Sequence, residues 1–172
     1  MKRLLQRFFN RIEKIYRKKN NWTLIPNSEY GFVYIDRFEY KGKDKLLSDG
    51  TVITKGDLVA EMHINNKEVK EGSFKMVFKI FNSEFKSMAE AVSNDNEYSQ
   101  IKAIFGRTVL YPITKKMGFE VFDIEKKSLK IFLKLWDNLI KLVFSKSKKG
   151  KFIVREPKEI WISKEKLISC VK

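Results

Sequence analysis

Residues 46–64, LLSDGTVITKGDLVAEMHI, hold the signals that decide the fold. The dipeptide Asp49-Gly50 lies between two apolar runs, an arrangement that predicts a β-hairpin with a tight turn. A second turn is expected at Lys55-Gly56-Asp57, because glycine beside a polar residue favours a reversal of the chain. The residues after this turn, 58–64, are therefore expected to form the next strand.

The strand pattern extends toward the N-terminus. Residues 31–41, GFVYIDRFEYK, are dense in aromatic and β-branched side chains, which favours a strand there and makes residues 31–66 a strand-rich region. Before this region, apolar side chains recur with the period of an α-helix over positions 2–19, and arginine and lysine occupy most positions between them. Residues 1–20 are therefore expected to form a basic amphipathic helix.

Helical and extended patterns alternate after the strand-rich region. Helices are expected over residues 73–92 and 128–144, with a short one over residues 97–105 that ends at Gly106. Strands are expected over residues 118–124, 152–155 and 160–163. This order predicts an α+β fold in which several amphipathic helices pack on a mostly antiparallel sheet. Residues 1–172 are expected to form a single domain, to which residues 73–172 contribute helices and returning strands.

The composition is that of a folded chain from a reducing compartment. Hydrophobic residues make up 43% of the 172 residues and aromatic residues 13%, enough for one core. Cys170 is the one cysteine and His63 the one histidine, so an internal disulfide and a His/Cys zinc site are excluded. No apolar run is long enough for a transmembrane helix or a signal peptide. We therefore expect a cytoplasmic protein without a metal or other cofactor.

The net charge of +15, from 36 lysines and arginines against 21 acidic residues, favours anionic partners. The first helix combines cations with apolar side chains, so we expect it to bind an anionic lipid surface on the inner face of the membrane, or an anionic polymer. The residues expected in this contact are Lys2, Arg3, Arg7, Phe8, Phe9, Arg11, Arg17, Lys18 and Lys19. Two alternatives stay open: the helix packs on the domain's own core, or the lysine surplus reflects an AT-rich genome. No protein partner is indicated.

Residues 57–65 contain the side chains that are most suggestive of chemistry. Successive side chains of a strand alternate between its faces, so Glu61 and His63 share one face, and Asp57 joins them if the strand begins that early. A carboxylate beside an imidazole can orient a general base and raise its basicity. The alternative is a polar sheet face with a structural histidine, since the spacing places no nucleophile beside His63.

The string Leu47-Ser48-Asp49-Gly50-Thr51-Val52-Ile53-x-Lys55-Gly56-Asp57-x-Val59-x-Glu61-x-His63-x-x-Asn66 resembles the YkoP-like domain of Gram-positive bacteria. The likeness includes the basic aromatic helix before the strands and the Gly118-Phe119 junction after them, and so covers most of the chain. Members of that family occur alone and attached to polysaccharide deacetylase domains. The resemblance therefore implies a setting in cell-envelope or polysaccharide metabolism. It supplies no mechanism, because a chain with one histidine lacks the Asp-His-His metal site of a deacetylase.

Three functions are compatible with these observations, and whether the chain is an enzyme stays open. The first is a non-catalytic accessory protein at an anionic surface. The second is a transferase of acyl or glycan groups that uses Glu61 and His63. Residues 110–121 resemble the closing helix-to-strand step of GNAT acyltransferases, although the Gly-rich turn with which those enzymes hold a pyrophosphate is missing. The third is sequence-independent nucleic-acid binding, which the scarcity of arginine and the core-like spacing of the aromatic residues disfavour.

Overall fold

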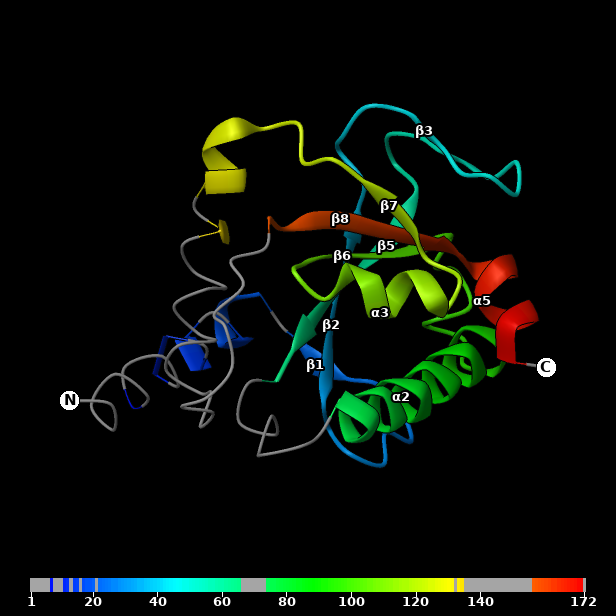
Figure 1. Cartoon of the computed structure of the whole chain (residues 1–172). Helices are drawn as coiled ribbons and strands as arrows, with labels where there is room; N and C mark the ends of the chain where they lie inside the picture. The colour runs from blue at the N-terminus through cyan, green and yellow to red at the C-terminus, as the bar shows by residue number, and fades with distance from the viewer. Residues whose placement is uncertain are drawn as a thin grey trace.

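A sheet of six strands organises the computed structural model, with helices on one face and a separate two-stranded hairpin toward the other (Figure 1). The structure describes residues 7, 11–12, 14–15, 17–20, 22–65, 74–131, 133–134 and 156–171. The sheet has the order β1-β2-β5-β6-β8-β7, and the bounds of its strands are β1 (Thr23–Leu24), β2 (Val33–Glu39), β5 (Leu58–Ile64), β6 (Ala103–Thr108), β7 (Glu120–Phe122) and β8 (Lys158–Ser163).

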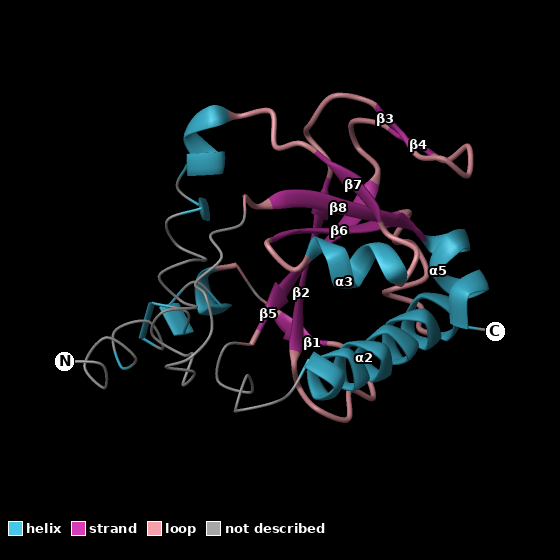
Figure 2. Ribbon diagram, in the orientation of Figure 1, coloured by secondary structure: helices cyan, strands magenta, loops and turns pink. Residues whose placement is uncertain are grey.

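The remaining elements lie around this sheet (Figure 2). The hairpin consists of β3 (Lys45–Leu46) and β4 (Val52–Ile53). The helices are α2 (Phe74–Asn94), α3 (Tyr111–Lys116) and α5 (Lys164–Val171). Residues 7, 11–12, 14–15 and 17–19, which fall in the expected first helix, are also helical, as are residues 127–131 and 133–134. Together these elements confirm the α+β class that the order of sequence patterns predicts.

One parallel pairing lies at the centre of the sheet. β5 and β6 run parallel, and the long helix α2 lies between them in the chain, as a parallel crossover requires. The other described neighbours in the sheet run antiparallel. β8 inserts between β6 and β7 although it follows both in the chain. The sheet is therefore mostly antiparallel, as expected.

The helix-covered face of the sheet is apolar. Alternate residues of the strands point toward α2, α3 and α5, and they are Val33, Ile35, Ala60, Ile104, Ile160 and Ile162. From α2, Phe81, Phe85 and Met88 pack against them at the spacing of one helix face. This face contains the larger of two buried apolar clusters.

The opposite, hairpin-covered face begins with a second apolar cluster. Its sheet residues are Phe38, Val59, Ala103, Phe105 and Trp161, and Leu47 and Ile53 of the hairpin cover them. The Trp161 ring stacks on that of Phe105, with the ring centroids 4.4 Å apart. The apolar residues on either side of the Asp49-Gly50 turn therefore supply the cover of this cluster.

Polar residues of the same turn attach the hairpin to the sheet. The Ser163 hydroxyl donates to a carboxylate oxygen of Asp49 and accepts from the backbone N–H of Lys166, so it also caps the start of α5. The Ser48 hydroxyl donates to Glu120 over 2.8 Å. Gly50 has a φ of 88°, which a residue with a side chain adopts only under strain. The conspicuous Ser48-Asp49-Gly50 motif thus has a structural role.

The short helix expected over residues 97–105 is wrong. Residues 96–100 form a turn, and β6 follows from Ala103, with Gly106 inside the strand. A Cβ on Gly106 would meet the carbonyl oxygen of Met62 at 3.4 Å, so the glycine permits close approach of β5 instead of ending a helix. Two further expectations, the strand over residues 152–155 and most of the helix over residues 128–144, lie outside the described residues.

Candidate functional site

Beyond the second apolar cluster, the hairpin-covered face carries a polar patch. Its members are Tyr34 and Asp36 from β2, Glu61 and His63 from β5, Arg107 from β6 and Glu159 from β8. The strand register pairs Tyr34 with His63, Asp36 with Glu61, and Arg107 with Glu159. Residues two apart on a strand share a face, so the register brings these six side chains to one area of the sheet.

Arg107 is the central cation of the patch. Its Nη1 donates to Oε1 of Glu61 over 2.5 Å, and its Nε lies 3.4 Å from Oε2 of Glu159. Lys45 also pairs with Glu159, over 3.0 Å. The side chains of Arg107, Glu61 and Glu159 are only 26%, 16% and 16% exposed, so water screens these pairs less than it screens pairs on an open surface.

Burial perturbs both acids that face each other across β2 and β5. It raises the pKa of Glu61, although the nearby Arg107 acts in the opposite direction and lowers it. Burial also raises the pKa of Asp36, against a smaller lowering by the indole N–H of Trp22. The two carboxyl groups are therefore easier to protonate than carboxyl groups in water.

His63 lies under an aromatic cover. Its ring stacks on Trp22 with the centroids 3.8 Å apart and the planes 9° from parallel. Burial is the main influence on its pKa, Arg107 adds to it, and together they lower the pKa to about 4. The imidazole is therefore uncharged at neutral pH. A base of this pKa is much weaker than a base tuned to neutral pH.

One buried nitrogen atom of this area, Nε2 of His63, has no polar partner among the described residues. Nε of Arg107 makes only its ionic contact with Glu159, and the indole N–H of Trp22 acts on Asp36, both without full hydrogen-bond geometry. Buried polar atoms in proteins are nearly always paired, so the ring nitrogen of His63 indicates a place for water or a polar ligand.

The first helix is attached at the polar patch. Nη1 of Arg17 donates to the Tyr34 hydroxyl over 2.6 Å, and the guanidinium carbon lies 5.2 Å from the centre of the Tyr34 ring. The backbone N–H of Trp22 donates to the carbonyl of Arg17 over 3.1 Å. Arg17 and Trp22 thus link the N-terminal segment to β2 and β5.

The structure brings together only part of the expected catalytic set. Glu61 and His63 share one face as the strand period predicts, but the carboxylate of Glu61 is held by Arg107. Asp57 lies six residues before His63, ~20 Å along an extended strand, and there it accepts from Thr54 and pairs with Lys102. Hydrogen bonds from Lys102 and Thr54 lower the pKa of Asp57. A catalytic role of these residues stays a prediction.

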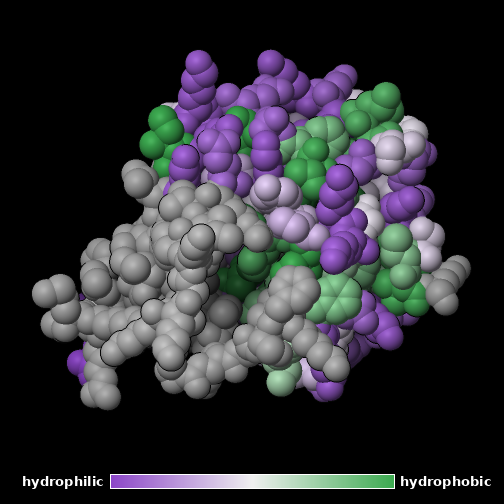
Figure 3. Space-filling view, in the orientation of Figure 1, coloured by the Kyte–Doolittle hydropathy of each residue, from purple (hydrophilic) through white to green (hydrophobic). Residues whose placement is uncertain are grey.

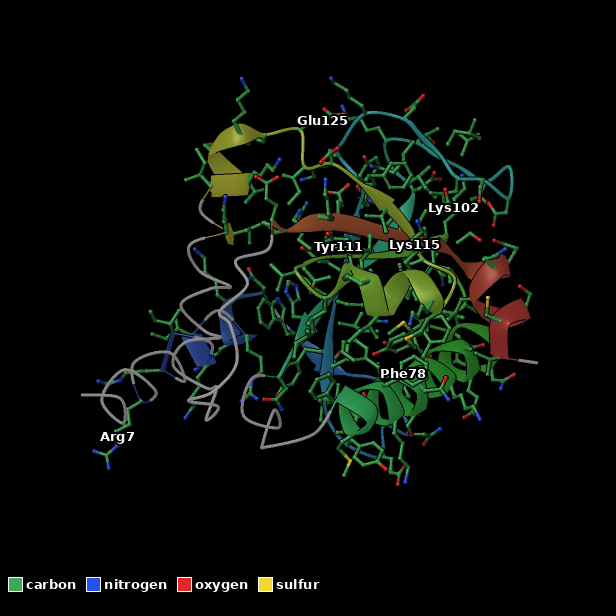
Figure 4. The ribbon with its side chains drawn as sticks, viewed as in Figure 1. Arg7, Phe78, Lys102, Tyr111, Lys115 and Glu125 are labelled. Atoms are coloured by element: carbon green, nitrogen blue, oxygen red, sulfur yellow. The ribbon has the colours of Figure 1, made fainter. Side chains whose placement is uncertain are left out.

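The residues expected at an anionic surface divide into three groups. Arg7, Arg11, Lys18 and Lys19 are exposed, and Figure 4 shows Arg7 extending away from the sheet. Arg17 is half-buried and bonded to Tyr34. The rest, Lys2, Arg3, Phe8 and Phe9, lie outside the described residues.

Sequence reasoning missed Trp22, Tyr34, Asp36 and Arg107. One signal was present: Asp36 directly follows the apolar residues Val33 to Ile35 of β2 and lies on the face opposite Ile35. The pairing of Arg107 with Glu61 joins residues 46 positions apart, which no local pattern indicates. Across the described ranges, no group of three or more His, Cys, Asp or Glu side chains could hold a metal ion.

No helix in the described part of the chain is both long and apolar enough to span a membrane.

The sequence model of the YkoP domain family matches residues 2–171 of this chain. A relative from Bacillus subtilis (strain 168), described as "Uncharacterized protein YkoP", is 27% identical over 165 residues, which are 91% of this chain and 90% of the relative. No solved structure matches. The description of the relative states no activity, so these likenesses assign a family and no reaction.

Proposed function

This chain belongs to the YkoP domain family, and we propose that it is a non-catalytic accessory of cell-envelope or polysaccharide metabolism that acts at an anionic surface. One observation carries the proposal. The cations of the first helix that the structure describes on its surface, Arg7, Arg11, Lys14, Lys18 and Lys19, are exposed and make no ion pair with a described acid.

An exposed apolar side chain lies among these cations. Ile15 is 60% exposed, although an isoleucine normally contributes to a core. A helix that presents cations together with apolar side chains is typical of segments that lie at the boundary between lipid head groups and acyl chains. Arg17 and Trp22 hold the C-terminal end of this segment on the sheet, so the exposed cations are carried on a folded support.

The test compares binding of the full chain to vesicles of anionic and of neutral phospholipid, at low and at physiological salt. We expect binding to anionic vesicles only. Each lysine or arginine near such a surface contributes about 1 kcal/mol, so the substitutions Arg7→Gln, Arg11→Gln, Lys18→Gln and Lys19→Gln together are expected to weaken binding by up to about a thousandfold.

A matched control removes the same charge from another exposed site. Lys115→Gln, Lys116→Gln, Lys126→Gln and Lys127→Gln alter exposed lysines of α3 and of the segment after β7. Equal loss in the two quadruple variants would show that only net charge matters and would contradict the proposal. Binding to duplex DNA with no binding to anionic vesicles would favour the nucleic-acid alternative instead.

A second candidate is a transferase of acyl or glycan groups, and the divergence of the parallel strands favours it. β5 and β6 pair only as far as Met62 and Gly106. Beyond this point β5 continues beside β2 and β6 continues beside β8, which leaves His63 and Arg107 where the two strands separate. Crevices at the carboxyl ends of parallel strands are common ligand sites in α/β sheets.

Titration with acetyl-coenzyme A and with UDP-N-acetylglucosamine, followed by amide NMR, tests this second candidate. A productive donor is expected to shift the resonances of His63 and Arg107, and His63→Gln is expected to abolish transfer while leaving the fold intact. A low-pKa histidine under Trp22 must be uncovered before it accepts a proton at neutral pH, so Trp22→Leu is expected to change the pH profile of the transfer. If neither donor shifts these resonances, this candidate is rejected.

A further inference from the structure

Trp22 covers part of the polar patch at the end of the first helix. Its ring stacks on His63 with the centroids 3.8 Å apart, and its backbone N–H donates to the carbonyl of Arg17. Arg17 in turn donates to the Tyr34 hydroxyl over 2.6 Å. The next residues, Thr23–Leu24, form β1 and pair with β2. Trp22 therefore lies at a junction between a strand of the sheet and a helix that carries exposed cations.

The cover leaves two polar groups poorly satisfied. Nε2 of His63 is buried and has no polar partner among the described residues. The indole N–H of Trp22 acts on Asp36 without full hydrogen-bond geometry. Water would give both nitrogen atoms the hydrogen bonds that burial withholds. The aromatic stack thus stabilises a closed arrangement that the hydrogen-bonding needs of these two groups oppose.

Arg17 is held by a neutral acceptor that has a second donor. The Tyr34 hydroxyl also accepts from the side-chain N–H of Asn65, over 3.3 Å. A phosphate oxygen of a lipid head group is anionic, and hydrogen bonds from a guanidinium group to phosphate are stronger and often bidentate. An anionic lipid surface can therefore take Arg17 from Tyr34, whose hydroxyl keeps a partner.

The surroundings of Arg17 suit the same kind of surface. Four residues close to it on the helix are exposed, and they are Lys14, Ile15, Lys18 and Lys19. Tryptophan concentrates where head groups meet acyl chains, because its ring lies among apolar groups there and its N–H finds an acceptor. Arg17 and Trp22 thus both gain polar contacts at such a surface. Since β1 is paired with β2, only the residues before Thr23 need to move.

We infer that Trp22 is a cover that an anionic lipid surface opens: as the first helix binds the lipid, Arg17 leaves Tyr34, Trp22 leaves His63, and solvent reaches the polar patch. This regulation rests on the proposed function, because it requires the first helix to bind anionic lipid. Away from the lipid the chain keeps His63 closed. A ligand of the polar patch would therefore reach His63 only on the surface.

The test measures how fast diethyl pyrocarbonate acylates His63, the one histidine of the chain. The reagent must reach an imidazole nitrogen to react, so the rate follows the fraction of molecules in which the cover is open. We expect vesicles of phosphatidylglycerol to raise the rate about tenfold or more. Vesicles of phosphatidylcholine and free inorganic phosphate are expected to leave the rate unchanged. Co-sedimentation of the same samples measures vesicle binding separately.

The two readouts separate failure of the cover from failure of the proposed function. Binding to phosphatidylglycerol vesicles without faster acylation of His63 leaves the proposed function standing and overturns the inference. Absence of binding overturns both. An equal rise of the rate with inorganic phosphate would show that a free anion opens the cover without a surface, and this result also overturns the inference.

Two single substitutions sharpen the result. Arg17→Gln removes the bond to the Tyr34 hydroxyl, and we expect it to raise the rate of acylation without lipid about threefold or more. Lys127→Gln removes one exposed cation from the segment after β7, where Figure 3 shows hydrophilic side chains, and is expected to have no effect. Equal rates in the Arg17 variant and the unmodified chain would contradict the inference. The vesicle comparison uses the unmodified chain, so its outcome does not depend on how the variant folds.

Discussion

The helix-covered face of the sheet buries isoleucines and alanine beneath α2, α3 and α5, whereas the hairpin-covered face holds a buried tryptophan together with half-buried ion pairs and an uncharged histidine. The first face is stabilised by removing apolar area from water, at about 25 cal/mol per Å². The second face adds charged groups that lose hydration on burial, and this loss offsets much of the attraction between them.

The comparison shows where stability alone does not explain the residues. An apolar patch of similar volume at Glu61, His63 and Arg107 would stabilise the sheet at least as well as the charged one. The pKa values of Glu61 and His63 also depart from their ordinary values, and both residues lie near the point where β5 and β6 separate. Perturbed groups in such positions are candidates for function.

The largest effect is expected within the apolar part of the hairpin-covered face. Trp161 stacks on Phe105, meets the edge of Tyr40 at 5.6 Å and donates through its indole N–H to Glu159. Trp161→Ala is expected to lower the free energy of unfolding by about 3–5 kcal/mol, and Ile104→Val on the other face by about 1 kcal/mol. Urea denaturation measures both. Equal losses would mean that the hairpin-covered face carries no special share of the stability.

The next effect concerns the charged part of that face. Arg107→Met leaves the carboxylate of Glu61 half-buried without its cation and is expected to cost about 2–3 kcal/mol, which allows for partial screening by water. Adding Glu61→Gln is expected to recover most of the loss, because no unpaired charge is then left beside β5. A double-mutant cycle in urea measures the coupling. A double variant as unstable as Arg107→Met would indicate that Arg107 acts by packing on Phe105.

The smallest effect is a pH dependence that distinguishes the two faces. The pKa of His63 is about 4 in the folded chain and 6.5 in its ordinary state, so between these values the unfolded chain binds a proton that the folded chain does not. Stability is therefore expected to fall by about 2 kcal/mol as the pH drops from 7 to 4.5. Because burial raises the pKa of Glu61, this residue makes the stability rise as the pH falls toward the ordinary pKa of a glutamate. This contribution is the same with or without His63.

The variant His63→Phe keeps an aromatic ring under Trp22 and removes the titration. Between pH 7 and pH 4.5, the free energy of unfolding of this variant is expected to fall by about 2 kcal/mol less than that of the unmodified chain. Thermal melts at pH 7 and pH 4.5 supply the comparison. Parallel pH profiles of the two proteins would show that His63 takes up its proton as readily in the folded chain as in the unfolded chain.

Local patterns predicted the elements that have one side against the core and the other side toward the surface. The Asp49-Gly50 turn, the strand at residues 58–64 and the helix α2 all have one polar and one apolar side, and periodicity detects this difference. β6 was missed because it is buried on both faces: Ile104 faces the helices while Ala103 and Phe105 face the hairpin. A short, wholly apolar run carries no period that separates strand from helix.

The candidate site was predictable only as far as a single strand determines it. The period of two placed Glu61 and His63 on one face, but their partners Arg107, Trp22 and Tyr34 come from three other segments. The expected general base assumed that the carboxylate would serve the imidazole. Tertiary structure gives the carboxylate to Arg107 and lowers the pKa of the imidazole by burial.

The insertion of β8 between β6 and β7 has a consequence for synthesis. Both neighbours of β8 leave the ribosome before β8 does. In the nascent chain, Ile104 and Phe105 of β6 are therefore unpaired until residues 160–162 have been synthesised. Transiently exposed apolar strand edges are what chaperones and aggregation act on. Closure of the sheet thus depends on completed translation past residue 163, and a stall before residue 158 leaves an open edge at the middle of the sheet.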